Sequence, residues 1–323
     1  MRGLARAQNV EALRAHPGRG DFVHPVYWLA ACALLVATRL GVGLGQPAAV
    51  VAATIVFVCG GMPHGAYDIA LLRQAVRIDR RAMLLAVGCY GAIAIAMATL
   101  WAWLPLAALI VFLVTSAVHF GEDWVMLDDP LLRFAAGAAV IAAPAIGHPG
   151  DVSALFIAMS DARAQIIAQI IVAAAPVALL VTAVGILIAW RDGSRQWAAA
   201  MALCLGLLIV LPPVAGFALF FVFLHSPRHL VQTRFLLKTW PLSQWLMTGL
   251  AISGVAIVGW IGLQHMEMPR IDATIVAQGF QLIASVALPH LLFSRWLERR
   301  LDRAVLSWPP PTMGASQSST TGL

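Results

Sequence analysis

Ten long apolar stretches, joined by short polar connections, constrain the fold of this chain more than any other feature. They lie at about residues 26–44, 47–63, 83–104, 105–121, 132–147, 166–190, 197–212, 214–225, 244–264 and 275–293. Charged residues make up only 11% of the sequence, whereas an ordinary soluble domain carries about 25%. Such a chain has too few polar residues to cover a water-exposed surface, which indicates that it lies in a membrane. Its apolar segments should then be helices, because a helix satisfies its own backbone hydrogen bonds within the bilayer. The sequence therefore predicts an all-α, polytopic transmembrane helical bundle.

The number of membrane crossings is eight to ten, because several stretches are short. A crossing takes about 20 residues, with a range of about 17–25, and Pro212-Pro213 divides one long apolar run. With ten crossings and the N-terminus inside, all but three of the 21 Lys and Arg residues fall on the inner side, the exceptions being Arg39, Arg163 and Arg270. Cytoplasmic loops favour Lys and Arg. We therefore prefer ten crossings and expect both termini to be cytoplasmic.

The stretches also divide the chain into three parts. Residues 1–25 are polar and predict a cytoplasmic N-terminal lead-in, and residues 304–323 are rich in Pro and Ser and predict a disordered tail. Residues 26–303 form the membrane domain, in which any catalytic site must lie. Within it, residues 148–165 predict an outer loop with at most a short amphipathic segment.

Four of the predicted helices end in a histidine at the same face of the membrane. His64, His119, His225 and His290 end the second, fourth, eighth and tenth stretches, and His229 lies just beyond. A single histidine at an interface is most often a satisfied polar residue. Five at one face point to function, because ionisable residues at membrane depth are costly and imidazole is the commonest metal ligand. We expect these helix ends to meet around one metal ion.

The segment from His225 to His229 places two of these imidazoles four residues apart, on one face of a helix. Pro227 cannot donate to the carbonyl group of Phe223, so the helix is expected to kink or stop there. In the second case Ser226 would cap a new helix that begins at Pro227.

Acidic side chains follow two of the histidines. Asp68 comes four residues after His64 and would accept the proton of its non-ligating nitrogen, or else pair with a nearby arginine. Glu122 and Asp123 follow His119 and are either acceptors behind the metal ligands or solvated loop charges.

Imidazole ligands without a thiolate suit iron, copper or zinc rather than magnesium or calcium. Four neutral ligands leave the charge of a divalent ion uncompensated, which favours the binding of dioxygen, and a HExxH motif for zinc hydrolysis is absent from the sequence. His290 remains open as a fifth ligand, a residue of a substrate pocket or a structural hydrogen-bond donor.

Taken in order, the motifs of this chain resemble those of the Brp/Blh family of bacterial and archaeal membrane β-carotene 15,15′-dioxygenases. The motifs are Pro63-His64-Gly65-Ala66-Tyr67-Asp68, His119-Phe120-Gly121-Glu122-Asp123, His225-Ser226-Pro227-Arg228-His229 and Pro289-His290. The resemblance covers about residues 26–300 and implies Fe(2+) bound by His64, His119, His225 and His229. His290, Asp68 and Glu122 are then candidates for positions behind these ligands.

The resemblance also implies a reaction. The family uses dioxygen to cleave the central 15,15′ double bond of β-carotene into two molecules of all-trans-retinal. It implies a multi-pass protein of the inner (plasma) membrane, with β-carotene, dioxygen and lipid as partners, a rhodopsin as acceptor of the retinal, and no nucleic acid.

Two other functions remain open on the residues alone. A membrane hydroxylase or desaturase with a di-iron centre would use several HxxxH or HxxHH boxes, whereas this chain has one HxxxH. A non-enzymatic transporter of metal ions would spread its histidines through the depth of the membrane.

Overall fold

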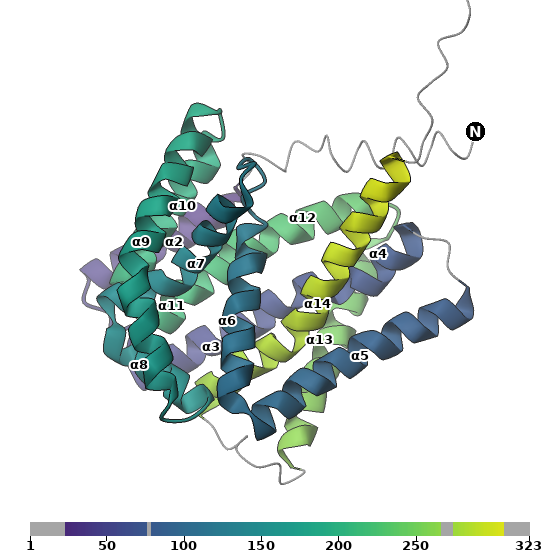
Figure 1. Ribbon diagram of the computed structural model, residues 1–323, viewed down its shortest axis with the longest axis horizontal. Coiled ribbons are helices and arrows are strands. Elements are labelled where there is room, and N and C mark those ends of the chain that lie inside the picture. Colours follow the sequence, from purple (N-terminus) through teal and green to yellow (C-terminus); the bar gives the residue numbers. More distant parts are fainter. Residues whose placement is uncertain (1–22, 76–78, 266–273, 307–323) are drawn as a thin grey trace, which may run out of the picture.

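The computed structural model describes residues 23–75, 79–265 and 274–306, and the regular elements within these ranges are all helical (Figure 1). In order they are α2 (Pro25–Arg39), α3 (Pro47–Gly61), η1 (Met62–Tyr67), α4 (Asp68–Ala75), α5 (Arg80–Trp103), α6 (Pro105–Gly121), α7 (Pro130–Gly147), α8 (Pro149–Met159), α9 (Ala164–Arg191), α10 (Arg195–Val210), α11 (Pro213–Ala218), η2 (Leu219–His225), α12 (Ser226–Leu236), α13 (Leu242–Gln264) and α14 (Ile275–Leu306). The predicted all-α fold is confirmed, and each of the ten apolar stretches contains a helix.

Seven helices in the described ranges are long and apolar enough to cross a membrane, judged by length and composition. They are Pro47–Gln74, Arg80–Trp103, Pro130–Gly147, Ala164–Arg191, Pro213–Leu236, Leu242–Gln264 and Ile275–Trp296. Helices α2, α6, α8 and α10 are apolar but shorter. The chain is thus a polytopic membrane protein, and the preferred count of ten crossings stays a prediction. The lead-in and the tail lie almost wholly outside the described residues, as do both termini.

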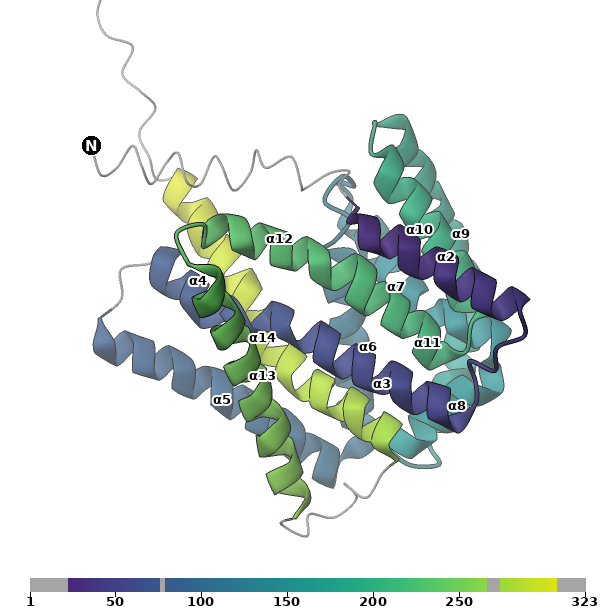
Figure 2. The ribbon, with the colours of Figure 1, turned by 180° about the vertical axis from the view of Figure 1, so that it is seen from behind.

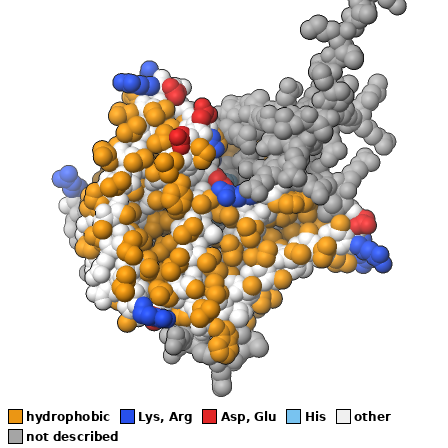
Figure 3. All heavy atoms as spheres, in the orientation of Figure 1, with side chains coloured by type: hydrophobic (Ala, Val, Ile, Leu, Met, Phe, Trp, Pro, Cys, Tyr) orange, Lys and Arg blue, Asp and Glu red, His pale blue; other side chains and the backbone are white. Residues whose placement is uncertain are grey.

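The surface of the bundle is the kind that lipid covers. Large apolar side chains stand exposed on the outer helices, among them Leu180, Leu250 and Val255. Hydrophobic side chains cover most of the face shown in Figure 3, and the charged ones lie mainly near its rim. Soluble monomers rarely expose contiguous apolar patches of more than a few hundred Å².

One side of the bundle is closely packed. Helix α7 lies against α6, α9 and α10, and small residues allow the contact with α6: a Cβ added at Gly137 would collide with the carbonyl oxygen of Ala117. The backbones of α6 and α7 therefore touch, as is common where small residues meet between membrane helices.

The other side of the bundle is built around α14. This helix packs against α5, α3, α8 and α13 (Figures 1 and 2). Gln281 of α14 donates its side-chain Nε2 to the carbonyl oxygen of Met159 at the end of α8, 2.8 Å away. The prediction of an outer loop at 148–165 was wrong for residues 149–159, because Pro149 begins a helix that packs against α9, α7 and α14.

Candidate metal centre

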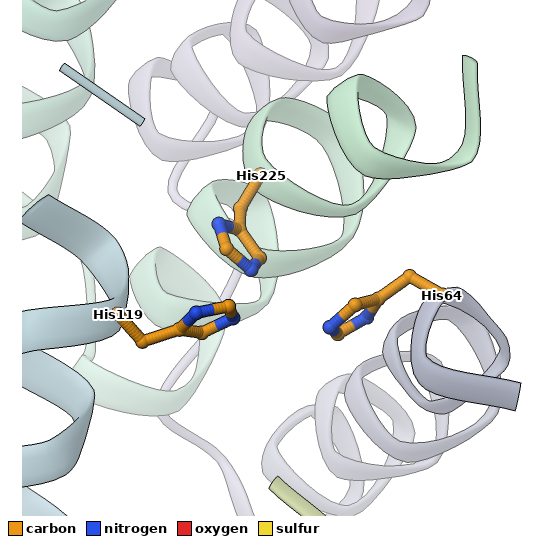
Figure 4. Close-up of side chains that lie close together, drawn as sticks. All are labelled: His64, His119 and His225. Carbon is orange, nitrogen blue, oxygen red and sulfur yellow. The ribbon is translucent and has the colours of Figure 1, made fainter. Parts of the chain in front are cut away.

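Three imidazoles from separate helices point toward one another in the interior of the bundle (Figure 4). They belong to His64 on η1, His119 on α6 and His225 on η2. One ring nitrogen of each lies within 4.8 Å of the others, and all three side chains are buried. The expected meeting of helices far apart in the sequence is therefore present.

Two further histidines join these three to make a cluster of five. The ring of His229 is centred 4.5 Å from that of His225, and the ring of His290 is centred 5.1 Å from that of His64 and 5.4 Å from that of His119. Asp123, His225 and His229 form a second group whose ligand atoms lie within 4.8 Å of one another. The two groups share His225 and therefore adjoin each other.

The helices change geometry where they carry these histidines. The helix that contains His64 tightens to a 3-10 turn at Met62–Tyr67, and the one that contains His225 widens to a π-helix at Leu219–His225. Each irregular turn has a proline within it or just after it, which removes one backbone donor. Departures of this kind from the α-helix are frequent at functional sites.

The structure corrects one expectation about these helices and selects between two alternatives at Pro227. Only α6 ends close to its histidine, whereas the helices with His64, His225 and His290 continue beyond them. The chain also remains helical through Pro227, and Ser226 has helical backbone angles rather than those of a cap. The Oγ of Ser226 instead lies 3.3 Å from Nδ1 of His64.

Three of the imidazoles donate Nδ1 to a carboxylate. His119 donates to Glu122 over 3.1 Å, His225 to Asp123 over 2.7 Å, and His290 to Asp68 over 2.8 Å. Asp68 therefore pairs with His290 and not, as expected, with His64. The Nδ1 of His64 donates to the carbonyl oxygen of Gly61, one turn earlier.

The two acidic residues after α6 are held in their ionised form. Burial alone would raise the pKa of Glu122, but its hydrogen bond to His119 and the nearby Arg295 guanidinium lower it. Burial would likewise raise the pKa of Asp123, and the imidazoles of His225 and His229 outweigh it and hold that pKa well below its ordinary value. The centre is thus surrounded by fixed negative charge.

Where its imidazoles face one another, the cluster has the properties of a metal site. The Nε2 atoms of His119, His225 and His290 are buried and have no hydrogen-bond partner among the described residues, whereas Nε2 of His229 lies 3.3 Å from Oδ1 of Asp123. A buried polar atom without a partner is costly, whereas a metal-bound histidine typically donates its other nitrogen to a carboxylate or carbonyl group. The donor set therefore fits a metal ion.

A mostly apolar cavity of about 520 Å³ adjoins the cluster. His64, His119 and His290 lie in its wall, and the rest of the lining comes mainly from α5, α6, α13 and α14. Ligand pockets in proteins measure about 300–1,000 Å³. The centre can therefore act on an apolar molecule that is held beside it.

Some residues of the site were not selected from the sequence. Arg295 of α14 donates to Oε1 of Glu122 over 2.6 Å, and Tyr90 of α5 donates to Oδ2 of Asp68 over 3.2 Å. Both pairs join helices that no local pattern connects. Asp123 was weighed only as an acceptor or a solvated charge, and its exposed fraction of 2% excludes the second alternative.

Comparison with known proteins identifies relatives of this chain. The family model for beta-carotene 15,15′-dioxygenase matches residues 53–298. A protein of uncultured marine bacterium 66A03, named beta-carotene 15,15′-dioxygenase, is 29% identical over 190 residues, which are 55% of this chain and 66% of that relative, slightly under two thirds of its length. No solved structure matches the chain.

Proposed function

Because the chain belongs to the beta-carotene 15,15′-dioxygenase family, we propose that it cleaves the central double bond of β-carotene with dioxygen and releases two molecules of all-trans-retinal. The observation that carries the proposal is the position of the imidazole cluster in the wall of an apolar cavity. A hydrocarbon substrate needs such a cavity, and a reaction with dioxygen needs a redox-active metal beside it.

We propose that the metal is Fe(2+) and that His64, His119, His225 and His229 hold it. The absence of a thiolate from the groups of potential ligands in the described residues agrees with imidazole ligation of iron, copper or zinc, and the family favours iron. When bound, ferrous iron supplies the one-electron chemistry that lets dioxygen react with a closed-shell polyene. The carboxylates of Glu122 and Asp123 orient two of the imidazoles and offset the charge of the ion.

The chain itself binds and orients the polyene. The cavity presents aromatic and aliphatic side chains, among them Phe112, Phe221 and Trp260, so recognition rests on shape rather than on hydrogen bonds. Holding one double bond beside the centre replaces a bimolecular encounter with a fixed geometry. The apolar walls also exclude water from the reacting atoms.

The polyene is expected to enter sideways from the bilayer, between α5 and α13. Ile95 on α5 and Val255 on α13 both line the cavity, and both are strongly exposed on the outer surface. The cavity wall and the lipid-facing surface therefore share residues on both helices. A long hydrocarbon dissolved in the bilayer would then reach the centre without crossing water.

Expression in cells that make β-carotene tests the proposal. We expect loss of the orange colour and the appearance of retinal, detected by chromatography. His64→Ala should leave the colour unchanged, because it removes one of the three converging nitrogens. Unchanged β-carotene in cells that contain folded, iron-loaded wild-type protein would contradict the proposed activity.

Iron stoichiometry separates the proposal from a di-iron hydroxylase or desaturase. The five clustered imidazoles are few for two irons, so we expect one iron per chain, and two would favour the di-iron alternative. A transporter of metal ions would leave β-carotene intact. The family further suggests the inner (plasma) membrane as location and a rhodopsin as acceptor of the retinal.

A further inference from the structure

We propose that His290 binds the metal ion directly through Nε2, and that Asp68 is the residue that positions it. This inference rests on the metal centre of the proposed function and adds a ligand to it.

The ring of His290 lies closer to those of His64 and His119 than the ring of His229 does, although, of the two, only His229 belongs to a group of potential ligands whose atoms lie within 4.8 Å of one another. The ring of His290 is centred 5.1 Å from that of His64 and 5.4 Å from that of His119. The corresponding separations for His229 are 5.7 and 5.5 Å. The two rings lie 6.5 Å apart, the largest of these separations, so they flank the three converging nitrogens from different sides.

The hydrogen bonds of His290 repeat those of two residues in the converging group. His119 and His225 each donate Nδ1 to a carboxylate and have a buried Nε2 with no partner among the described residues. His290 has the same arrangement, with Asp68 as its acceptor. An imidazole binds a metal ion in this state, with its tautomer fixed and Nε2 free. The three histidine–carboxylate pairs share this arrangement, which indicates that His290 is a metal ligand like His119 and His225.

The surroundings hold this arrangement in place. A Cβ added at Gly65 would lie 3.3 Å from Cγ and Nδ1 of His290, so the glycine lets the imidazole approach η1 closely. The same Oδ2 atom of Asp68 accepts from His290 and from Tyr90. A carboxylate fixed by two donors, itself buried, restricts the rotation of the imidazole and leaves Nε2 as its free nitrogen.

Iron binding by purified full-length protein tests the inference without reference to catalysis. Metal-free protein would be titrated with Fe(2+) under anaerobic conditions against a competing chelator, and the number of coordinated imidazoles would be determined by X-ray absorption at the iron edge. We expect His290→Ala to lower the affinity by at least about 100-fold and to remove one imidazole. Asp68→Asn should lower it by about 10- to 100-fold, as is usual for residues that orient a ligand.

Two further variants keep the result interpretable. His148→Ala makes the same substitution at a histidine that contacts the carbonyl oxygen of Val210, outside the cluster, and should leave affinity unchanged. His290→Asn keeps an amide donor at the position of Nδ1, which faces Asp68, and carries the test if His290→Ala does not fold. Wild-type affinity and an unchanged imidazole number in His290→Asn would overturn the inference, since His290 would then serve only as a partner of Asp68. Protein that binds iron through His290 but leaves β-carotene intact would instead overturn the proposed function alone.

Discussion

The two sides of the bundle differ in how closely their helices approach one another. In the apolar segment of α7, 44% of the residues are buried, whereas only 11% are buried in the corresponding segments of α5 and α13. On the α7 side, a Cβ added at Gly121 would lie 2.5 Å from the carbonyl oxygen of Arg133. On the other side, Gly91 and Gly259 have no heavy atom within 4 Å of an added Cβ. The backbone contact between α6 and α7 thus contrasts with the open space beside Gly91 of α5 and Gly259 of α13.

This difference separates two tasks. His119 lies between Ala117 and Gly121, the two α6 residues whose backbone touches α7 at Gly137, so close packing fixes its position. His64 and His290 lie in the wall of the cavity, where α5 and α13 leave room. In the proposed function, the packed side would hold His119 in place at the metal centre, and the open side would admit the substrate.

The largest effect is expected from Gly137→Leu on the packed side. The added side chain would meet backbone atoms of Ala117 and Gly121, which cannot rotate away, so α6 and α7 must separate. Overpacking of this kind costs about 3 kcal/mol or more when the backbone is the obstacle. We expect little protein to be recovered as a monodisperse species in detergent, and a lower midpoint of thermal unfolding for what is recovered.

Gly254→Leu on α13 is the matched control for this change. No heavy atom lies within 4 Å of a Cβ at Gly254, so the same substitution should give wild-type recovery and thermal stability. Equal losses in both variants would show that the contrast between the two sides does not control folding.

The fold follows from the sequence as far as local patterns determine it. Every apolar stretch forms a helix, because an apolar segment in lipid must satisfy its own backbone. Helix α8 was missed because Gly150 and Asp151 near its start resemble a loop, and its stability comes from packing against α9, α7 and α14. The continuation of the helix beyond His64 was missed because polar residues after it suggested the end of a crossing, whereas continuation beyond His225 was one of two alternatives left open.

Most residues of the site were predictable from the sequence, but most of their pairing was not. The histidines stand out because ionisable residues are rare in apolar helices, and the structure brings all five together. The carboxylates were candidates as well, but Asp68 lies four residues from His64 and 222 positions from His290, the imidazole that it binds. Such a pairing depends on how α14 crosses η1, which no local pattern specifies.

On the open side, Gly91→Leu should reduce catalysis without disturbing the metal. Gly91 lines the cavity and has space for a side chain, so leucine would occupy volume that the polyene needs. We expect β-carotene turnover to fall by at least about tenfold, in the range that a few methylene groups contribute in an apolar pocket. Retinal formation by purified protein and iron content measure the two quantities separately.

Gly88→Leu is the control for Gly91→Leu. It lies one turn earlier on α5, outside the cavity lining, with equal space around it, and should leave turnover unchanged. If Gly91→Leu kept wild-type turnover, the polyene would have to bind elsewhere than between α5 and α13.

The smallest effect is expected from Glu122→Gln, which tests the link between the two sides. Glu122 accepts from His119 at the end of α6 and from Arg295 on α14, so one carboxylate joins the packed helix to the open one. Glutamine keeps its size but loses the charge and one of the two acceptor oxygens. We expect the affinity for Fe(2+) to fall by about 10- to 100-fold, with thermal stability of the metal-free protein little changed.

Asp128→Asn removes one negative charge from an exposed carboxylate of the same loop and is the control for this variant. Its affinity for Fe(2+) should match that of the wild type, because Asp128 lies outside both groups of potential metal ligands. An equal loss of affinity in the two variants would mean that general negative charge, rather than the hydrogen bond to His119, supports the centre. General negative charge would also predict that Arg295→Ala, which removes a positive charge beside Glu122, raises the affinity for Fe(2+).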